Sequence, residues 1–70
     1  MIEIKTVFAD NGDDMLKKTT KLNNQMYSKY AYDTEFELVK SHLDIHKISD
    51  SKVLYCNVLV YEVGDDDAEL

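Results

Sequence analysis

The sequence has few of the residues on which enzymes, metal sites and disulfide-stabilised folds depend. Its 70 residues include two glycines, one cysteine, and neither proline nor tryptophan. The single cysteine, Cys56, cannot form an internal disulfide, and no Cys/His cluster has the spacing of a structural zinc site. There is no phosphate-binding glycine loop and no motif typical of a hydrolase. We therefore expect no enzymatic activity, no metal and no cofactor.

Arginine is also absent, since all eight basic residues are lysines, and 14 acidic residues outnumber them to give a net charge of −6. Nucleic-acid binding draws much of its strength from cations that neutralise phosphates, and the reading of bases relies on arginine. Direct binding to nucleic acid is therefore not expected. The acidic balance favours a basic partner, or contributes to solubility alone.

Long apolar runs are missing as well. No run approaches the roughly 20 residues needed to span a membrane. The first residues, MIEIKTVF, have neither the positive charge nor the long apolar segment of a signal peptide. A lone thiol without an export signal is typical of an intracellular protein. The sequence thus predicts a cytoplasmic location and no membrane association.

The length allows one domain at most. We assign this domain to residues 1–64 and interpret the acidic residues 65–70 as a solvated tail. A chain of this size buries only about 60% of its unfolded surface, so it usually needs a disulfide, a metal or a partner chain. Because the first two are not expected, oligomerisation is the remaining route to stability.

The stretch 52–63, KVLYCNVLVYEV, is the most apolar in the chain and predicts the central strand. Its apolar residues alternate without interruption, so both faces of the strand are apolar. One set is Leu54, Cys56, Val58 and Val60, and the other is Val53, Tyr55, Leu59, Tyr61 and Val63. A strand of this kind needs cover on both faces.

The N-terminal half predicts a strand followed by a helix. Residues 2–9 alternate as in a strand with one apolar face, and the DNGDD loop that follows is a turn and helix-start signal. We expect Asp13 to cap an amphipathic helix over residues 14–32, because apolar residues recur there at spacings of three and four. Lysines occupy its polar side, where a solvated face is the favoured interpretation.

Residues 36–48, FELVKSHLDIHKI, fit both a strand and a helix. Val39, Ser41, Leu43 and Ile45 alternate as in a strand, although a helical period can also be traced. The short polar turn at 49–51 leads into the central strand and makes a hairpin natural, so we favour a strand with a bulge near Lys40 and Ser41. The predicted order is β-α-β-β, an α+β fold.

One helix can cover only one face of such a sheet. The second face is expected to remain open, with Tyr55, Leu59 and Tyr61, or the side chains opposite to them, at its surface. Exposed apolar patches of this kind mark interfaces, and tyrosines are common there. The sequence therefore predicts a homodimer that forms through the sheet, with these three residues at its interface.

Two arrangements resemble functional sites. His42, Asp44 and His46 would share one face of a strand, as in a metal site, but the remaining ligands are lacking and an exposed polar face is the simpler interpretation. Cys56 lies between apolar neighbours and is interpreted as a small buried hydrophobe, not a reactive thiol.

The carboxylates are the strongest functional signal. They gather before the helix and at the entry to the second strand, and Asp44 and Asp50 mark the hairpin. Rows of carboxylates can imitate the phosphates of a duplex, whose charges occur about every 1.7 Å along the axis. The candidate partner-binding residues are Asp10, Asp13, Asp14, Glu35, Glu37 and Asp44, with the tail as an auxiliary.

In size, acidity and element order, with its IEIKTVF start and YCNVLVYEV end, the chain resembles the small host-takeover proteins of lytic Bacillus phages. Among these is an acidic dimeric DNA mimic that binds the bacterial nucleoid protein HU. This resemblance implies a non-enzymatic inhibitor that occupies the DNA-binding surface of an HU-like partner in the host cytoplasm.

The chain also resembles dodecin, a small flavin-binding oligomer with the same β-α-β-β order. Dodecins stack the flavin on a tryptophan, which this sequence lacks, so His42 or Tyr55 would have to replace it. A third interpretation is a structural interaction module whose binding does not depend on charge.

Overall fold

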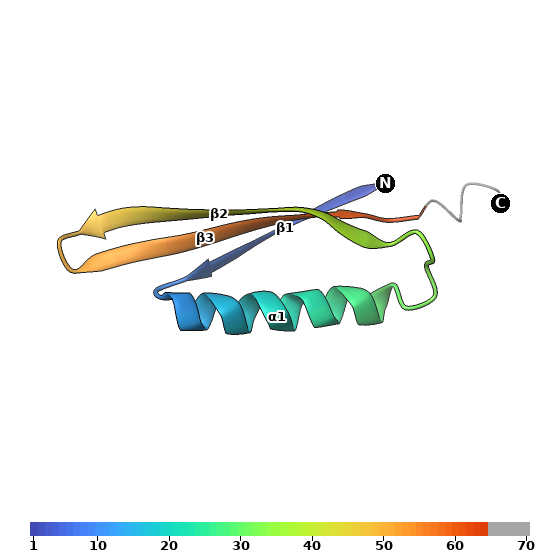
Figure 1. The fold of residues 1–70 in the computed structure, drawn as a ribbon, viewed down its shortest axis with the longest axis horizontal. Coiled ribbons are helices and arrows are strands. Elements are labelled where there is room, and N and C mark those ends of the chain that lie inside the picture. The colour runs from blue at the N-terminus through green and yellow to red at the C-terminus, as the bar shows by residue number, and fades with distance from the viewer. Residues whose placement is uncertain (65–70) are drawn as a thin grey trace.

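The computed structural model describes residues 1–64, and the predicted acidic tail at 65–70 lies outside them. Four elements follow one another along the chain (Figure 1). They are the strand β1 (Ile2–Ala9), the helix α1 (Gly12–Lys29), the strand β2 (Glu37–Ser49) and the strand β3 (Lys52–Glu62). The predicted order is confirmed, and the first strand has the predicted bounds.

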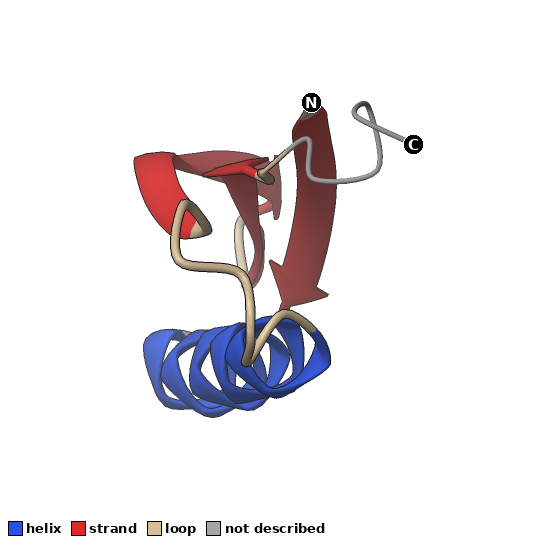
Figure 2. Cartoon of the chain, turned by 90° about the vertical axis from the view of Figure 1, so that its right-hand side faces the viewer, coloured by secondary structure: helices blue, strands red, loops and turns tan. Residues whose placement is uncertain are grey.

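The strands form a three-stranded antiparallel sheet in the order β1-β3-β2, so the most apolar strand lies in the centre. The helix lies on one face of this sheet only (Figure 2), where it contacts β1 and β3 but not β2. The α+β fold is thus confirmed, with one helix on one face of an antiparallel sheet.

The helix starts earlier than the sequence suggests. Asn11, not Asp13, is the N-cap: its backbone is extended and its side-chain Oδ1 accepts a 2.8 Å hydrogen bond from the backbone N–H of Asp14. The prediction of Asp13 as the cap is therefore wrong, and Asp13 lies in the first turn instead. The helix ends at Lys29, before the predicted limit, and its C-cap is Tyr30.

The ambiguous stretch is a strand, as predicted. β2 pairs with β3 in a hairpin, and the register shifts between Leu38 and Lys40, just before the expected bulge position. A second shift lies between Lys47 and Ser49, next to the turn. No residue of β2 is buried, because the helix does not reach this strand.

The core lies between the helix and the strands β1 and β3. Its largest fully buried side chains are Leu59 and Tyr61, which are 1% and 0% exposed. Both face the helix, so the prediction that they form the dimer surface is wrong, and Tyr55 on the same face is half-buried. Cys56 points to the opposite face and is also half-buried, so it is not the core residue that the sequence suggested.

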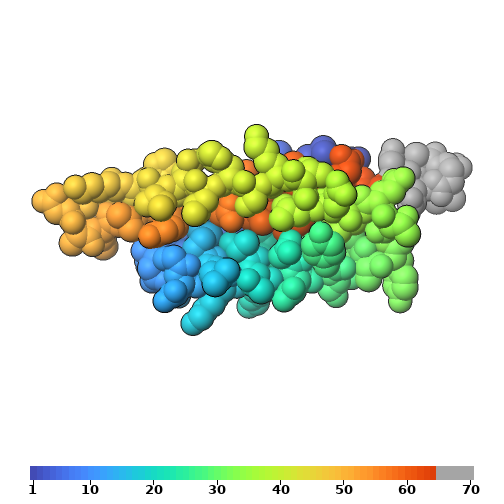
Figure 3. Space-filling view, viewed as in Figure 1, coloured from blue at the N-terminus to red at the C-terminus, as the bar shows by residue number. Residues whose placement is uncertain are grey.

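The molecule is a rod. Its radius of gyration is 14.8 Å and its dimensions are 54 × 17 × 14 Å, whereas a compact chain of this length has a radius of gyration of about 11 Å. The hairpin of β2 and β3 extends past the start of α1 and makes one end of the rod (Figures 1 and 3). The elongated shape spreads the surface charges over a long distance.

Candidate functional site

The candidate site consists of exposed carboxylates, and the first group lies where β1 leads into α1. Asp10, Asp13 and Asp14 are all exposed. Asp13 and Asp14 occupy the first turn, where the positive end of the helix dipole stabilises negative charge. The Nδ2 group of Asn11 donates to Asp14 Oδ2 over 3.4 Å, while the structure gives no such bond for Asp10 or Asp13 among the described residues.

The second group lies at the other end of the helix, where the chain enters β2. Asp33 acts structurally there, since its carboxylate accepts from the backbone N–H of Gly64 at 2.7 Å and of Glu35 at 2.9 Å. The side chains of Glu35 and Glu37 are exposed. Glu37 pairs in the sheet with Glu62, which places a further carboxylate beside it.

The two groups remain apart. The helix between them has 18 residues, and such a helix is about 27 Å long. Asp44 belongs to neither group, because it pairs with Cys56 on the face of the sheet that points away from the helix. The structure therefore keeps the six candidate residues in three separate places along the rod and does not gather them into a single patch.

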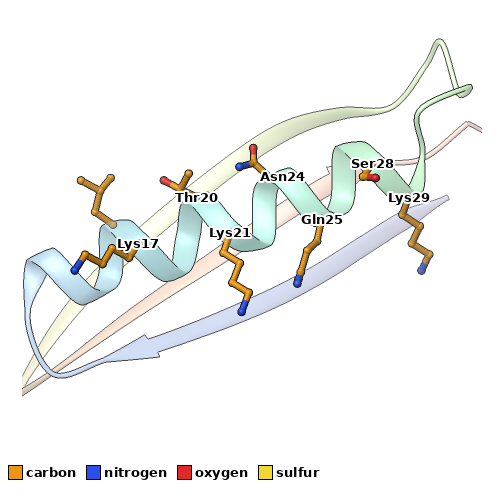
Figure 4. Close-up of a pocket in the computed structure, with 8 residues that line it drawn as sticks. Lys17, Thr20, Lys21, Asn24, Gln25, Ser28 and Lys29 are labelled. Carbon is orange, nitrogen blue, oxygen red and sulfur yellow. The ribbon is translucent and has the colours of Figure 1, made fainter.

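A row of lysines lies between the two acidic groups. The outer face of the helix carries, at four-residue spacing, Lys17, Lys21, Gln25 and Lys29 (Figure 4). Together with Leu16 these residues line a shallow, open groove. No ion pair with a described carboxylate engages these three lysines. The row is a basic solvated face, as the helical pattern predicted.

Lys18 has a different role. Its Nζ donates a 2.9 Å hydrogen bond to the backbone carbonyl of Phe8. Met1 and Val63 exchange both backbone hydrogen bonds, and in an antiparallel pair every second residue does so. Phe8 falls between such residues, so its backbone carbonyl points away from β3, to the free edge of β1. Lys18 therefore covers one carbonyl of an open sheet edge and places a charge beside it.

The residues whose spacing resembles a metal site, His42, Asp44 and His46, lie on the outer face of β2. His42 Nε2 is 3.1 Å from Asp44 Oδ1, and both side chains are exposed. Within residues 1–64 no group of three or more His, Cys, Asp or Glu side chains has a geometry that could hold a metal ion. Tyr55 lies on the other face of the sheet, so His42 and Tyr55 cannot stack on the same flavin within one chain.

Most of the tyrosines are used inside the fold. The Phe36 ring stacks on Tyr61 with centroids 5.3 Å apart and on Tyr30 at 4.9 Å, and Tyr27 meets Phe36 edge-on at 4.8 Å. Sequence reasoning did not single out Phe36, because it lies just outside the alternating run of β2. Among the tyrosines on the described part of the chain, Tyr32 is 99% exposed, and Tyr27 is 45% exposed although its ring contacts Phe36.

Burial also changes the acidity of Tyr61. Its hydroxyl donates a 2.9 Å hydrogen bond to Asn23 Oδ1. Desolvation, with a smaller contribution from the nearby Tyr27, raises the pKa of Tyr61 above its ordinary value. A raised pKa is expected for a phenol that is kept neutral in a core, and it gives Tyr61 no role as an acid or base near neutral pH.

No protein-family model matches this chain, and neither a curated protein nor a solved structure matches it. No helix in residues 1–64 has the length and apolar character needed to cross a membrane. The function is therefore inferred from the shape and charge of the molecule.

Proposed function

We propose that the protein is a non-enzymatic DNA mimic that binds a basic bacterial DNA-binding protein, of the type of the nucleoid protein HU, and occupies its DNA-binding surface. The observation that supports this proposal is the placement of exposed carboxylates at both ends of the helix α1, in an elongated molecule of net charge −6. A surface built to grip phosphates attracts such a distribution, and the attraction speeds association.

The distances fit a partner that follows a duplex. The two acidic groups are separated by a helix of 18 residues, about 27 Å in length, which is less than the 34 Å or so of one turn of DNA. A protein that contacts phosphates over one turn can therefore reach both groups. The lysine row on α1 disfavours a partner that lies along the outer face of the helix, so the contact is expected at the two acidic groups on either side of this row.

The proposal is tested by competition. Purified protein should displace DNA from an HU-like protein, and the displacement should weaken as salt rises from about 50 mM to about 200 mM, because exposed charge pairs are screened. Fluorescence anisotropy of a labelled duplex measures both effects. Displacement that does not depend on salt, or none at all, would contradict the proposal.

A matched pair of variants locates the contact. Asp13→Asn and Asp50→Asn remove the same charge, but Asp13 lies in the first acidic group whereas Asp50 lies in the hairpin turn beside Lys47. Asp13→Asn should weaken displacement by about two- to fivefold, the value of one exposed ion pair. Asp50→Asn should have less effect. Equal losses of displacement in the two variants would show that binding depends on total charge alone and that the first acidic group does not contact the partner.

A further inference from the structure

The face of the sheet opposite the helix is divided into an apolar half and a polar strip. Ile4 and Phe8 of β1 are 63% and 53% exposed there, next to half-buried Val58 and Val60 of β3. The strip runs along β2 and consists of Glu37, Lys40, His42, Asp44 and His46. These side chains share the outer face because they pair, in the same order, with Glu62, Val60, Val58, Cys56 and Leu54 of β3.

The polar strip is complementary to a second copy of itself that runs in the opposite direction. If two such strips are aligned at His42, Lys40 of one lies opposite Asp44 of the other, and Glu37 lies opposite His46. A symmetric dimer joins the same surface on both subunits, so a strip with this property matches a second copy of itself. A partner of unrelated sequence would not require such a pattern.

We propose that two copies pack sheet against sheet through this face, related by a two-fold axis along the row that contains Thr6, Val58 and His42. The two sheets then run antiparallel at the usual separation of about 10 Å. Lys40 faces the partner's Asp44, and the reciprocal pair lies across the axis. On the apolar half, the same operation places Ile4 opposite the partner's Phe8.

Charge opposes the approach of a second copy less at this face than elsewhere. The whole chain carries a charge of −6, which opposes the approach of an identical molecule. On the outer face, however, Glu37, Asp44 and Glu62 are accompanied by Lys40, the N-terminal amine at 3.5 Å from Glu62, and the two histidines. Two copies therefore repel each other less through this face than through the acidic group at the start of α1.

The available area is of the right order. The central strand has 11 residues and the sheet has three strands, which gives a flat footprint of about 500 Å². Side-chain relief adds to this value, and a stable interface buries about 800 Å² on each partner. The dimer would leave α1, the first acidic group and Glu35 accessible, whereas Glu37 and Asp44 would lie in the interface. It thus deepens the proposed function by fixing the spacing between two sets of carboxylates.

The test measures mass and requires no partner protein, so its failure is distinguishable from failure of the proposed function. Sedimentation equilibrium at micromolar concentration should give twice the mass of the chain. Lys40→Glu and Asp44→Lys should each weaken the dimer about tenfold, because each places like charges opposite one another. The double variant should recover the dimer, since the exchanged charges pair again across the axis. A monomeric native chain, or a double variant weaker than both single ones, would overturn the proposal.

A second pair of variants tests the face itself. Phe8 and Ile45 are 53% and 56% exposed, but they lie on opposite faces of the sheet. Phe8→Asp should abolish the dimer and leave the circular dichroism spectrum of the fold unchanged. Ile45→Asp should leave the mass at that of the dimer. Dissociation by Ile45→Asp with a dimer that survives Phe8→Asp would place the interface on the other face and overturn the proposal.

Discussion

The two faces of the sheet are built from the same strands but have opposite environments. On the helix side of β3, Leu59 and Tyr61 are 1% and 0% exposed. On the other side Val58 and Val60 are half-buried, and the neighbouring Ile4 is 63% exposed. Both faces are apolar, so hydrophobicity alone does not decide which of them the helix covers.

The polar atoms distinguish the faces. Tyr61 donates to Asn23 on the helix, and Asn57 donates to the helical Thr19 over 3.4 Å. Cys56, Val58 and Val60 on the opposite face have no comparable groups. Because a buried polar atom without a partner is costly, only the face that carries Asn57 and Tyr61 gains from helical residues that can bond to it. The covered face is thus selected by its few polar side chains.

The largest effect is expected from removing the aromatic centre of the covered face. Tyr61→Ala should lower the free energy of unfolding by about 3–5 kcal/mol, as truncation of a buried aromatic leaves a cavity. It also removes the ring that stacks on Phe36. Because the single core of a chain this small rarely supplies more than about 3–5 kcal/mol, the variant should be largely unfolded. Urea denaturation followed by circular dichroism measures this loss.

Val58→Ala is the control on the open face of the same strand. Val58 is half-buried, so its truncation should lower the free energy of unfolding by less than about 1.5 kcal/mol under conditions in which the chain is monomeric. Equal losses for the two variants would show that the two faces contribute alike and would remove the basis of the comparison.

A smaller effect should follow from removing the polar group that links the covered face to the helix. Asn57 is 7% exposed, and its Oδ1 accepts from Ser41 Oγ at 3.0 Å while its amide donates to Thr19 Oγ1. Asn57→Ala leaves both hydroxyls without this partner and should cost about 1–3 kcal/mol. Thermal unfolding of the variant measures the loss.

A double-mutant cycle separates the network from simple packing. If the bond to the helix matters, Asn57→Ala should cost less in a Thr19→Val background than in the native chain, because the bond is already absent. Additive losses would mean that the Thr19–Asn57 contact contributes nothing to choosing the covered face.

The elements of the fold were predictable because periodicity is a local property. The alternation in β1 gave its bounds, and the turn before β3 correctly favoured a strand for β2. The N-cap was predicted wrongly because Asn11 and Asp13 are both good caps, and the choice depends on how the chain leaves β1. The direction in which the chain leaves β1 cannot be derived from the sequence alone.

The covered face and the arrangement of the charges could not be derived from the sequence. Leu59 and Tyr61 alternate with Val58 and Val60, so the pattern fits either face equally well. The order of the acidic residues in the chain indicates which of them are neighbours, but the place of Asp44 relative to the other carboxylates depends on the pairing of β2 with β3. The self-complementary strip on β2 became visible only once the register with β3 placed Lys40, His42 and Asp44 on one face.

A still smaller effect is expected from pH. The pKa of Tyr61 is raised in the fold, so above the ordinary pKa of about 10 the unfolded chain loses this proton before the folded chain does. Stability is then complete below that pH and falls as pH rises through the folded pKa. Tyr61→Phe should remove this alkaline loss and cost about 0.5–1.5 kcal/mol at neutral pH for the missing bond to Asn23. An unchanged alkaline slope in Tyr61→Phe would mean that other groups cause it.

The smallest effect tests the open face in the absence of a partner. Ile4 and Val7 lie in the same strand on opposite faces, and they are 63% and 8% exposed. In dilute solution Ile4→Thr should change the free energy of unfolding by less than about 0.5 kcal/mol, whereas Val7→Thr buries a hydroxyl and should cost about 1–3 kcal/mol. If two copies join through the open face, the cost of Ile4→Thr must grow with protein concentration, because association stabilises only the folded chain. A cost for Ile4→Thr that is small at every concentration would leave the two faces as different as they are in the single chain, with nothing to cover the second.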